Sequence, residues 1–554
     1  MSHSNISHQS LRTPKSEKLG YGLLFSLLSV LTSLSATAGN AGTGAGKAPK
    51  VVINILVDQL RSDYLQAFMP LYGHDGLLRL MNEGRVYSQA EHPMANPDLA
   101  SAAATIASGT SPCDHGIVGM KWLNRATLRP IFCIDDPEQK GVGTQSAFSP
   151  RFVQVSTIGD ELKVATEGAA KVYAIAPTPE AAILGGAHAA DAVAWIDDKT
   201  GRWCSSSYYG HSLPSWIAAR NTESMAVACE QTTWQPSNEL VGNFSYFLSQ
   251  GMRKPFAHKF KGPNRIASFK TSGLVNQEVA ELTALCIEKT PIGQDAITDY
   301  LSITFYAGNF EHKPANQAPM ELQDTYVRLD AAIAKLIGSV SQKIGLDHAL
   351  FVLTSTGSTD EEDGQLSKFR IPTGTIDIKR TAALLNMYLT AIYGQGTYVE
   401  ATFGTQLYLN HKLIENKQLN LSELLARSQD FLLQLSGVRD VYTSQRLLQG
   451  AWTPGISRFR NGYHTQHSGD IMIEVAPGWH YTNEDTNERR LVRASYVPFP
   501  IIFFGAGVGA HHDETPVGTD YIAPTLAGAM RIRAPNACNQ KPIAIYQSQT
   551  HNTK

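Results

Sequence analysis

The sequence predicts an α/β fold in which a mostly parallel sheet is sandwiched between helices, with an added cap or insertion region. The first observation is a nearly continuous apolar run over residues 51–57, which ends at Asp58. Such a run is typical of a strand buried on both faces. Similar runs occupy residues 171–175, 301–305, 350–354 and 500–504. The second observation is that helical patterns, at residues 76–82, 99–107 and 320–340, separate these runs, as in α/β folds.

One large domain over residues 50–537 accounts for most of the chain. The whole chain has 554 residues, of which 43% are hydrophobic, and this is enough to fill a sizeable core. Residues 188–291 are rich in aromatic side chains and are predicted to form an insertion or cap. Residues 360–462 are predicted to be irregular around one helix, at residues 421–435. Residues 538–554 are expected to be a polar, frayed tail.

Residues 1–38 have the pattern of a signal peptide. A polar start with Arg12, Lys15 and Lys18 precedes an apolar run over residues 23–34 and a small-residue triplet that ends at Ala38. The run is shorter than the ~18 apolar residues of a membrane span, and no later segment reaches that length. We expect cleavage after Ala38, a linker over residues 39–49, and an exported mature chain without a transmembrane helix, periplasmic or associated with the outer membrane.

The charge balance excludes one class of partner. Lys and Arg total 47 and Asp and Glu total 49, a formal net charge of −2, so no bulk basic field attracts nucleic acid. Export permits disulfides, but the sequence does not choose a pairing, and buried free thiols are an equal alternative. No CxxC pair indicates a structural zinc site. The six cysteines are Cys113, Cys133, Cys204, Cys229, Cys286 and Cys538.

Polar positions follow three of the predicted strands. Asp58 ends the first run, and the Asn309 and Ser355 regions follow two others. Ligands of open α/β sheets bind at the carboxyl ends of the strands. We therefore expect a site at this edge.

Seven segments in the same order resemble the phosphate-irrepressible, PafA-type alkaline phosphatases, relatives of the type I phosphodiesterase/nucleotide pyrophosphatases. The resemblance covers most of the mature chain and implies the superfamily fold, a mostly parallel sheet between helices with a cap. The segments are VVINILVDQLRSDYL (51–65), SGTSPCDHGIVGMKW (108–122), SPRFVQVSTIGDEL (149–162), AAILGGAHAADAVAWIDDKTGRW (181–203), ELQDTYVRLD (321–330), SGDIMIEVAPGW (468–479) and VPFPIIFFG (497–505).

In that family a threonine attacks phosphorus, two zinc ions activate it, and an asparagine, a lysine and an arginine bind the phosphate oxygens. The nucleophile position falls on Leu99, which has no attacking atom. The asparagine position is Met120, and the lysine and arginine positions are Thr178 and Glu180. The resemblance therefore implies loss of the nucleophile and of the phosphate clamp, with Glu180 expected to repel phosphate.

The metal-ligand positions of the family are also substituted here. Asp58 matches the first aspartate and is retained. The remaining positions are Asn309, Lys313 with His312 one residue away, Thr356, Gly357, and either Asn487 or Tyr496. At best Asp58 and His312 remain, and two scattered ligands do not hold a zinc pair.

Other residues offer alternative chemistry with a plainer structural interpretation. Ser101, Thr105 and Ser108 lie near position 99 but have no neighbouring base, so helix packing is their expected role. His464 and His467 have spacing that would suit a metal if a carboxylate joined them. The acidic residues 360–363 lack the pattern of a calcium loop and are expected to be a solvated turn.

The leading hypothesis is that the chain is a pseudoenzyme. It predicts an exported, non-catalytic alkaline phosphatase-like protein that serves as a binding or scaffolding subunit of a cell-envelope complex, with a protein partner and no cofactor. The first alternative is an active metal-dependent phosphate-ester hydrolase, acting on monoesters or diesters, with relocated ligands and zinc. The second is a binding module for a phosphorylated or lipid-like envelope ligand.

Overall fold

The central sheet of the chain confirms the predicted α/β architecture. The structure is a computed structural model that describes residues 48–242, 255–359, 372–450, 454–484, 488–493 and 497–546. The predicted signal peptide and most of the linker lie outside these residues. In the described part, eleven strands form one sheet in the order β21-β2-β20-β12-β1-β11-β6-β7-β8-β5, with β22 beside β2. The strands are β1 (Val51–Asp58), β2 (Arg85–Glu91), β5 (Gly141–Val142), β6 (Val172–Ile175), β7 (Ala192–Ile196), β8 (Trp203–Ser206), β11 (Asp299–Tyr306), β12 (Ala349–Ser355), β20 (Phe499–Gly505), β21 (His511–Asp513) and β22 (Val517–Gly518).

The middle of the sheet is parallel and its flanks are mixed. β1 pairs in parallel with β11 and β12, and β11 continues in parallel to β6 and β7. The strand β20 is antiparallel to both β12 and β2, and β8 is antiparallel to β7. The five predicted apolar runs correspond to β1, β6, β11, β12 and β20, and their burial explains why they are nearly continuous apolar segments.

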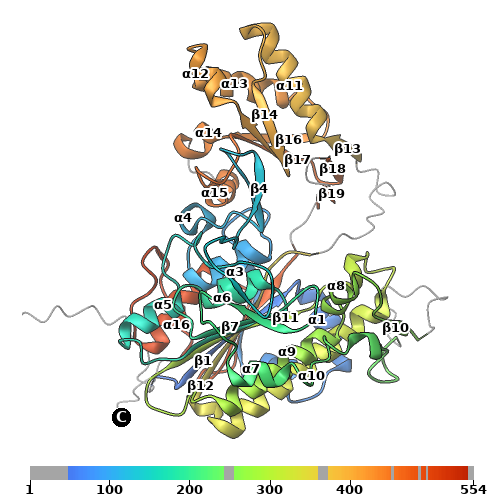
Figure 1. The fold of residues 1–554 in the computed structure, drawn as a ribbon, viewed down its shortest axis with the longest axis vertical. Helices are drawn as coiled ribbons and strands as arrows, with labels where there is room; N and C mark the ends of the chain where they lie inside the picture. The colour runs from blue at the N-terminus through green and yellow to red at the C-terminus, as the bar shows by residue number, and fades with distance from the viewer. Residues whose placement is uncertain are drawn as a thin grey trace, which may run out of the picture. The chain divides into compact units, whose positions relative to one another are not determined.

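Helices cover both faces of this sheet, as Figure 1 shows. Alternate residues of β1 point to opposite faces: Val51, Ile53 and Ile55 pack in one core cluster, and Val52 and Leu56 in the other. The first cluster includes helices α1 (Ser62–Ala67), α2 (Leu77–Glu83), α7 (Ser215–Arg220), α8 (Arg265–Lys270), α9 (Leu274–Lys289) and α10 (Pro319–Lys343). The second includes α3 (Leu99–Ser108), α5 (Ile158–Ala165), α6 (Pro179–Gly186) and α16 (Ile522–Met530).

The region expected to be a cap contributes to the central sheet itself. Residues 188–291 contain β7, β8 and α9, and Trp195 and Trp203 are buried at 2% and 0% exposure. Aromatic residues here fill the core, which explains their abundance. Within residues 188–291, β9 (Thr233–Trp234) pairs with β10 (His258–Lys259), and earlier in the chain β3 (Lys121–Asn124) pairs with β4 (Arg129–Phe132); both are two-stranded antiparallel sheets.

The region expected to be irregular contains regular elements with a core of their own. Residues 372–493 carry two small sheets, β14-β15-β17-β16 and β13-β18-β19, and the cluster around Leu385, Leu407 and Ile473 is separate from the central ones. The strands are β13 (Gly374–Asp377), β14 (Val399–Phe403), β15 (Gln406–Leu409), β16 (Val438–Thr443), β17 (Ile471–Val475), β18 (Trp479–Asn483) and β19 (Glu488–Leu491). The helices are α11 (Ile378–Tyr393), α12 (His411–Asn416), α13 (Leu421–Leu432), α14 (Ser444–Gln449) and α15 (Pro454–Asn461).

The remaining features of the described residues are the short helices, the cysteines and the segment near the C-terminus. Among these residues, no helix is both long enough and apolar enough to cross a bilayer. All six cysteines are described and are free thiols. Ile545, in the segment expected to be a frayed tail, is buried at 2% exposure. The remaining helices are α4 (Pro112–His115), η1 (Met69–Leu71), η2 (Cys229–Gln231), η3 (Phe310–His312), η4 (Leu346–His348) and η6 (Thr519–Tyr521).

Candidate active site

The carboxyl ends of β1, β11 and β12 meet at one edge of the sheet. Asp58 is in register with Tyr306 of β11, and Val57 is in register with Ser355 of β12. Parallel pairing therefore brings Asp58 and Thr356 together, as predicted from the positions of the strands. The amide of Ala307 donates to the Asp58 carbonyl (2.8 Å), which ties the start of the Asn309 loop to the same edge.

A hydrogen-bonded group of three side chains occupies this edge. The Thr356 hydroxyl donates to Asp58 Oδ1 (2.8 Å) and accepts from the Gln59 amide (3.0 Å). Thr356 Oγ1 also lies 3.1 Å from the hydroxyl of Ser358. Because Thr356 has one hydroxyl hydrogen and gives it to Asp58, Ser358 is the donor in the second contact. Thr356 is fully buried, whereas Ser358 is partly exposed.

Gly357 has a backbone conformation and surroundings that exclude a side chain. Its φ of +64° lies in the left-handed region, and an added Cβ would stand 2.8 Å from Phe499 Cε1 and 2.9 Å from His92 Cδ2. The His92 ring stacks on Phe499, with 5.2 Å between centroids. A residue with a side chain at position 357 would therefore have to displace both rings.

His92 is a member of this edge that sequence reasoning missed. Its Nε2 lies 3.2 Å from the Ser355 carbonyl, and its Nδ1 lies 2.8 Å from the Thr519 hydroxyl. Burial lowers the pKa of His92 to about 4. The ring is therefore neutral at pH 7, with Nε2–H donating to the carbonyl and Nδ1 accepting from Thr519. An isolated histidine after a strand carries no pattern that would have identified it.

Asn309 and His312 have different environments. Asn309 is buried, and its carbonyl accepts from the Tyr306 hydroxyl (2.8 Å) and the His312 amide (3.1 Å). His312 is exposed and has a left-handed φ of 55°. The neighbouring Lys313 forms an ion pair with Glu311 (2.7 Å). A one-residue gap in the match to the family would make His312 a metal ligand together with Asn309. The structure shows that His312 is exposed, whereas Asn309 is buried.

The first turn of α3 is where the family's nucleophile would lie. Leu99 is its first residue, 9% exposed, and packs in the core. Asp98 caps the helix: its carboxylate accepts from the amides of Ser101 (2.9 Å) and Met120 (2.6 Å). The positive end of the helix is therefore neutralised by the protein's own carboxylate, which the sequence analysis did not identify. Met120 reaches this site through its backbone, and 37% of the residue is exposed.

The start of α6 carries the other two clamp positions. Thr178 precedes the helix, and Glu180 lies in its first turn with 4% exposure. Burial raises the pKa of the Glu180 carboxyl, and its own backbone amide, the Thr178 hydroxyl and Lys270 act in the opposite direction. Burial thus disfavours the charged form of Glu180, and its repulsion of phosphate stays a prediction.

The described residues do not fit a zinc pair at this edge. Asp58 is a carboxylate already hydrogen-bonded by Thr356, Asn309 is an amide, and Gly357 has no side chain. Zinc sites are built from thiolates, imidazoles and carboxylates, with four ligands in most structural sites and three in most catalytic ones. Among the described residues, no group of three or more such side chains is close enough to share a metal. Asn487, Tyr496 and the acidic residues 360–363 lie outside the described residues.

The rings of His464 and His467 lie against each other at a tilt of 36°. The His467 ring lies 4.4 Å from Trp122 on one side and 4.4 Å from His464 on the other, centroid to centroid. His467 Nδ1 lies 2.6 Å from the Gly116 carbonyl, and His464 Nε2 lies 3.2 Å from Gln154 Oε1. These two ring nitrogens thus face different protein oxygens and do not share one metal position. Burial lowers the pKa of His464 to about 4.

The three hydroxyl residues of α3 have structural partners, as predicted. The Ser101 hydroxyl donates to Asp98 Oδ1 (2.8 Å), and the Ser108 hydroxyl donates to the Ala104 carbonyl (2.6 Å). Thr105 Oγ1 lies 3.1 Å from His115 Nε2. The His115 ring accepts the Ile117 amide at Nδ1 (3.1 Å), so its Nε2 carries the hydrogen and donates to Thr105. None of the three hydroxyls therefore lies beside an imidazole nitrogen that could accept its proton.

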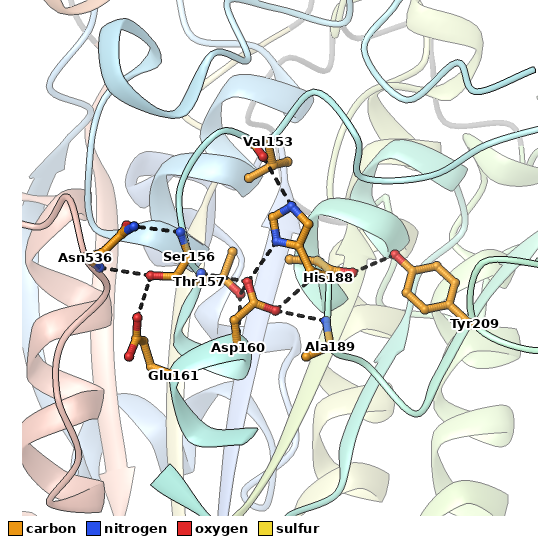
Figure 2. Close-up of polar contacts among 10 residues, drawn as sticks. Val153, Ser156, Thr157, Asp160, Glu161, His188, Ala189, Tyr209 and Asn536 are labelled. Atoms are coloured by element: carbon orange, nitrogen blue, oxygen red, sulfur yellow. Dashed lines mark hydrogen bonds and ion pairs between the residues drawn. The ribbon is translucent and has the colours of Figure 1, made fainter. Parts of the chain in front are cut away.

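A separate open groove of about 680 Å³ lies between the loop at residues 153–156 and α5. At its floor His188 forms an ion pair with Asp160 (3.0 Å), and its Nε2 faces the Val153 carbonyl (3.2 Å), as Figure 2 shows. The Asp160 carboxylate also accepts the amides of His188 and Ala189 and caps α5 with Thr157. Asp160 and His188 thus form hydrogen bonds that hold the surrounding loops, and neither is positioned as a reactive group facing the groove.

Comparison with known proteins identifies the family. The model of the type I phosphodiesterase / nucleotide pyrophosphatase family matches residues 52–497. The chain is 26% identical over 93% of its length to alkaline phosphatase PafA of Elizabethkingia meningoseptica, covering 98% of that protein. It is 26% identical over 89% of its length to alkaline phosphatase PhoV of Synechococcus elongatus, covering 92% of that protein. A crystal structure of a PafA mutant matches with a TM-score of 0.79 and 25% identity, covering 91% of this chain and 100% of the other.

These comparisons correct the functional hypothesis drawn from the sequence. The prediction of a non-catalytic scaffolding subunit is contradicted, because PafA and PhoV, matched over about nine-tenths of the chain, are alkaline phosphatases and the comparisons favour a phosphate-ester hydrolase. The substitutions at single positions carried too much weight in that hypothesis. With a family model matched over residues 52–497 and the same fold over 91% of its length, this chain belongs to the type I phosphodiesterase / nucleotide pyrophosphatase family.

Proposed function

We propose that the chain is an exported phosphate-ester hydrolase. The observation that carries this proposal is the likeness to alkaline phosphatases along nearly the whole chain, at 26% identity over 93% of its length. The edge of the sheet after β1 and β12 is the proposed place of reaction, because ligands of such sheets bind at the carboxyl ends of the strands.

The attacking group of this hydrolase is proposed to lie elsewhere than position 99. Leu99 has no nucleophilic atom, so the reaction needs another hydroxyl or a water molecule. Ser358 is our candidate, since its partly exposed hydroxyl donates to the buried Thr356 hydroxyl, which in turn donates to Asp58.

Hydrolysis of model esters tests the proposal. The purified full chain is assayed with p-nitrophenyl phosphate and with bis(p-nitrophenyl) phosphate, with and without added zinc. We expect turnover of at least one ester above the buffer rate. Binding of inorganic phosphate without turnover of either ester would overturn the hydrolase and support a binding module.

Two variants test the place of reaction. Ser358→Ala removes the proposed attacking hydroxyl and should abolish most of the turnover, whereas His188→Gln, in the separate groove, should leave it unchanged. Equal turnover of Ser358→Ala and the parent chain would show that another group attacks. A loss in both variants would point to a general effect on folding, which circular dichroism and the unfolding midpoint would reveal.

A further inference from the structure

The edge formed by Asp58 and Thr356 has features that replace a metal site. The resemblance places two zinc ions of the family at this edge, and Asp58, Asn309, Thr356 and Gly357 do not supply the carboxylate and imidazole ligands that such a pair needs. Here the Asp58 carboxylate receives a hydrogen bond from a fully buried hydroxyl, at 2.8 Å. Asp58 itself is partly exposed, and a hydrogen bond donated to a carboxylate favours its charged form. Thr356 thus supplies part of the compensation that a cation would supply elsewhere.

The rings packed against Gly357 fill the space where the side chain of a second ligand would lie. Gly357 is left-handed, and His92 and Phe499 lie within 2.9 Å of where its Cβ would be. Both rings are held: His92 by Thr519 and the Ser355 carbonyl, and Phe499 by its place in the central core. A single reverse substitution therefore does not recreate a metal ligand at this position.

We infer that this sheet edge is metal-independent, closed by the Thr356–Asp58 hydrogen bond and by the packing of His92 and Phe499 against Gly357. The inference rests on the donors and their packing, and only its statement about turnover rests on the proposed hydrolysis. The ordinary role of Thr356 is then to position Asp58. Zinc neither stabilises the folded chain nor supports its turnover.

Zinc content and thermal unfolding of the full chain, purified without chelator, test this inference. We expect fewer than about one zinc ion per ten chains by elemental analysis. The unfolding temperature should not change on addition of EDTA or of zinc, and any ester turnover should persist in EDTA. A zinc content near two per chain, or a fall of the unfolding temperature in EDTA, would overturn the inference. Absence of turnover with unchanged unfolding temperatures would refute the hydrolase and leave the metal-independent edge standing.

A double variant sharpens the test. Thr356→Asp combined with Gly357→His restores the family's two ligand types at these positions. We expect the double variant to unfold at a lower temperature than the parent chain, and added zinc not to raise it. Gly507→Ala serves as the control for glycine replacement, since Gly507 is also left-handed but has open space around it. A zinc-dependent rise in the unfolding temperature of the double variant alone would show that the edge accepts the metal.

Discussion

Replacement of Gly357 by alanine measures how tightly the edge is closed. At φ +64° a non-glycine residue costs about 1–2 kcal/mol by its backbone conformation alone. The added Cβ would also stand 2.8 Å from Phe499 and 2.9 Å from His92, closer than carbon atoms pack. Overpacking of this kind costs about 1–3 kcal/mol more. We expect Gly357→Ala to lower the free energy of unfolding by about 2–5 kcal/mol.

Gly507→Ala separates the two contributions. Gly507 has φ +79° and no atom within 4 Å of an added Cβ, so only the backbone cost applies, about 1–2 kcal/mol. Urea unfolding followed by tryptophan fluorescence gives both free energies, provided that the slope with urea concentration is unchanged. Equal losses in Gly357→Ala and Gly507→Ala would refute the reasoning, because they would show that His92 and Phe499 yield without cost.

Four further predictions concern single side chains. Thr356→Val should lower the free energy of unfolding by about 2 kcal/mol, as expected for the loss of a hydrogen bond from a buried hydroxyl to a carboxylate. Ser358→Ala, at a partly exposed position, should cost about 0.5 kcal/mol or less, and urea unfolding of both variants would measure this. Burial lowers the pKa of His115 to about 3, so as the pH falls below about 6.5 the unfolded chain takes up a proton that the folded chain does not. Between pH 7 and pH 5 the parent chain should therefore lose about 2 kcal/mol more stability than His115→Gln. An equal loss in the two chains would contradict this prediction. Asp160 raises the pKa of His188, so the pH dependence of stability has the opposite sign to that of His115. The stabilisation by the His188–Asp160 pair is present below about pH 6.5 and is lost as the pH rises through the folded-state pKa. His188→Gln should therefore be most destabilising at acid pH in the same unfolding experiment. Burial raises the pKa of Glu180, so Glu180→Gln should stabilise the chain more at pH 8 than at pH 5, and the reverse order would show that the carboxylate is compensated.

The sequence by itself determined the central architecture. The run at residues 51–57 became β1 because a strand covered by helices on both faces must be apolar at every position, and such a strand needs no knowledge of its neighbours to be recognised. The same reasoning located β6, β11, β12 and β20, and it placed Asp58 at the carboxyl end of the sheet.

Tertiary structure decided how much of the remaining chain belongs to that core. The tryptophans at positions 195 and 203 indicated a cap, yet they lie in strands of the central sheet, because aromatic side chains are as common in cores as in lids. Likewise, the segment expected to be irregular has short strands paired with distant partners, such as β15 with β17, and pairing of this kind leaves little periodicity in the sequence.

The site shows the same division. Residue identity alone established that Leu99 cannot attack phosphorus and that Gly357 cannot bind a metal. Only the folded chain showed that His92 and Phe499 fill the space at Gly357 and that Thr356 donates to Asp58. It also showed that His464 and His467 face different protein oxygens. These contacts join residues up to hundreds of positions apart, and their directions depend on rotamers and packing that no local sequence pattern encodes.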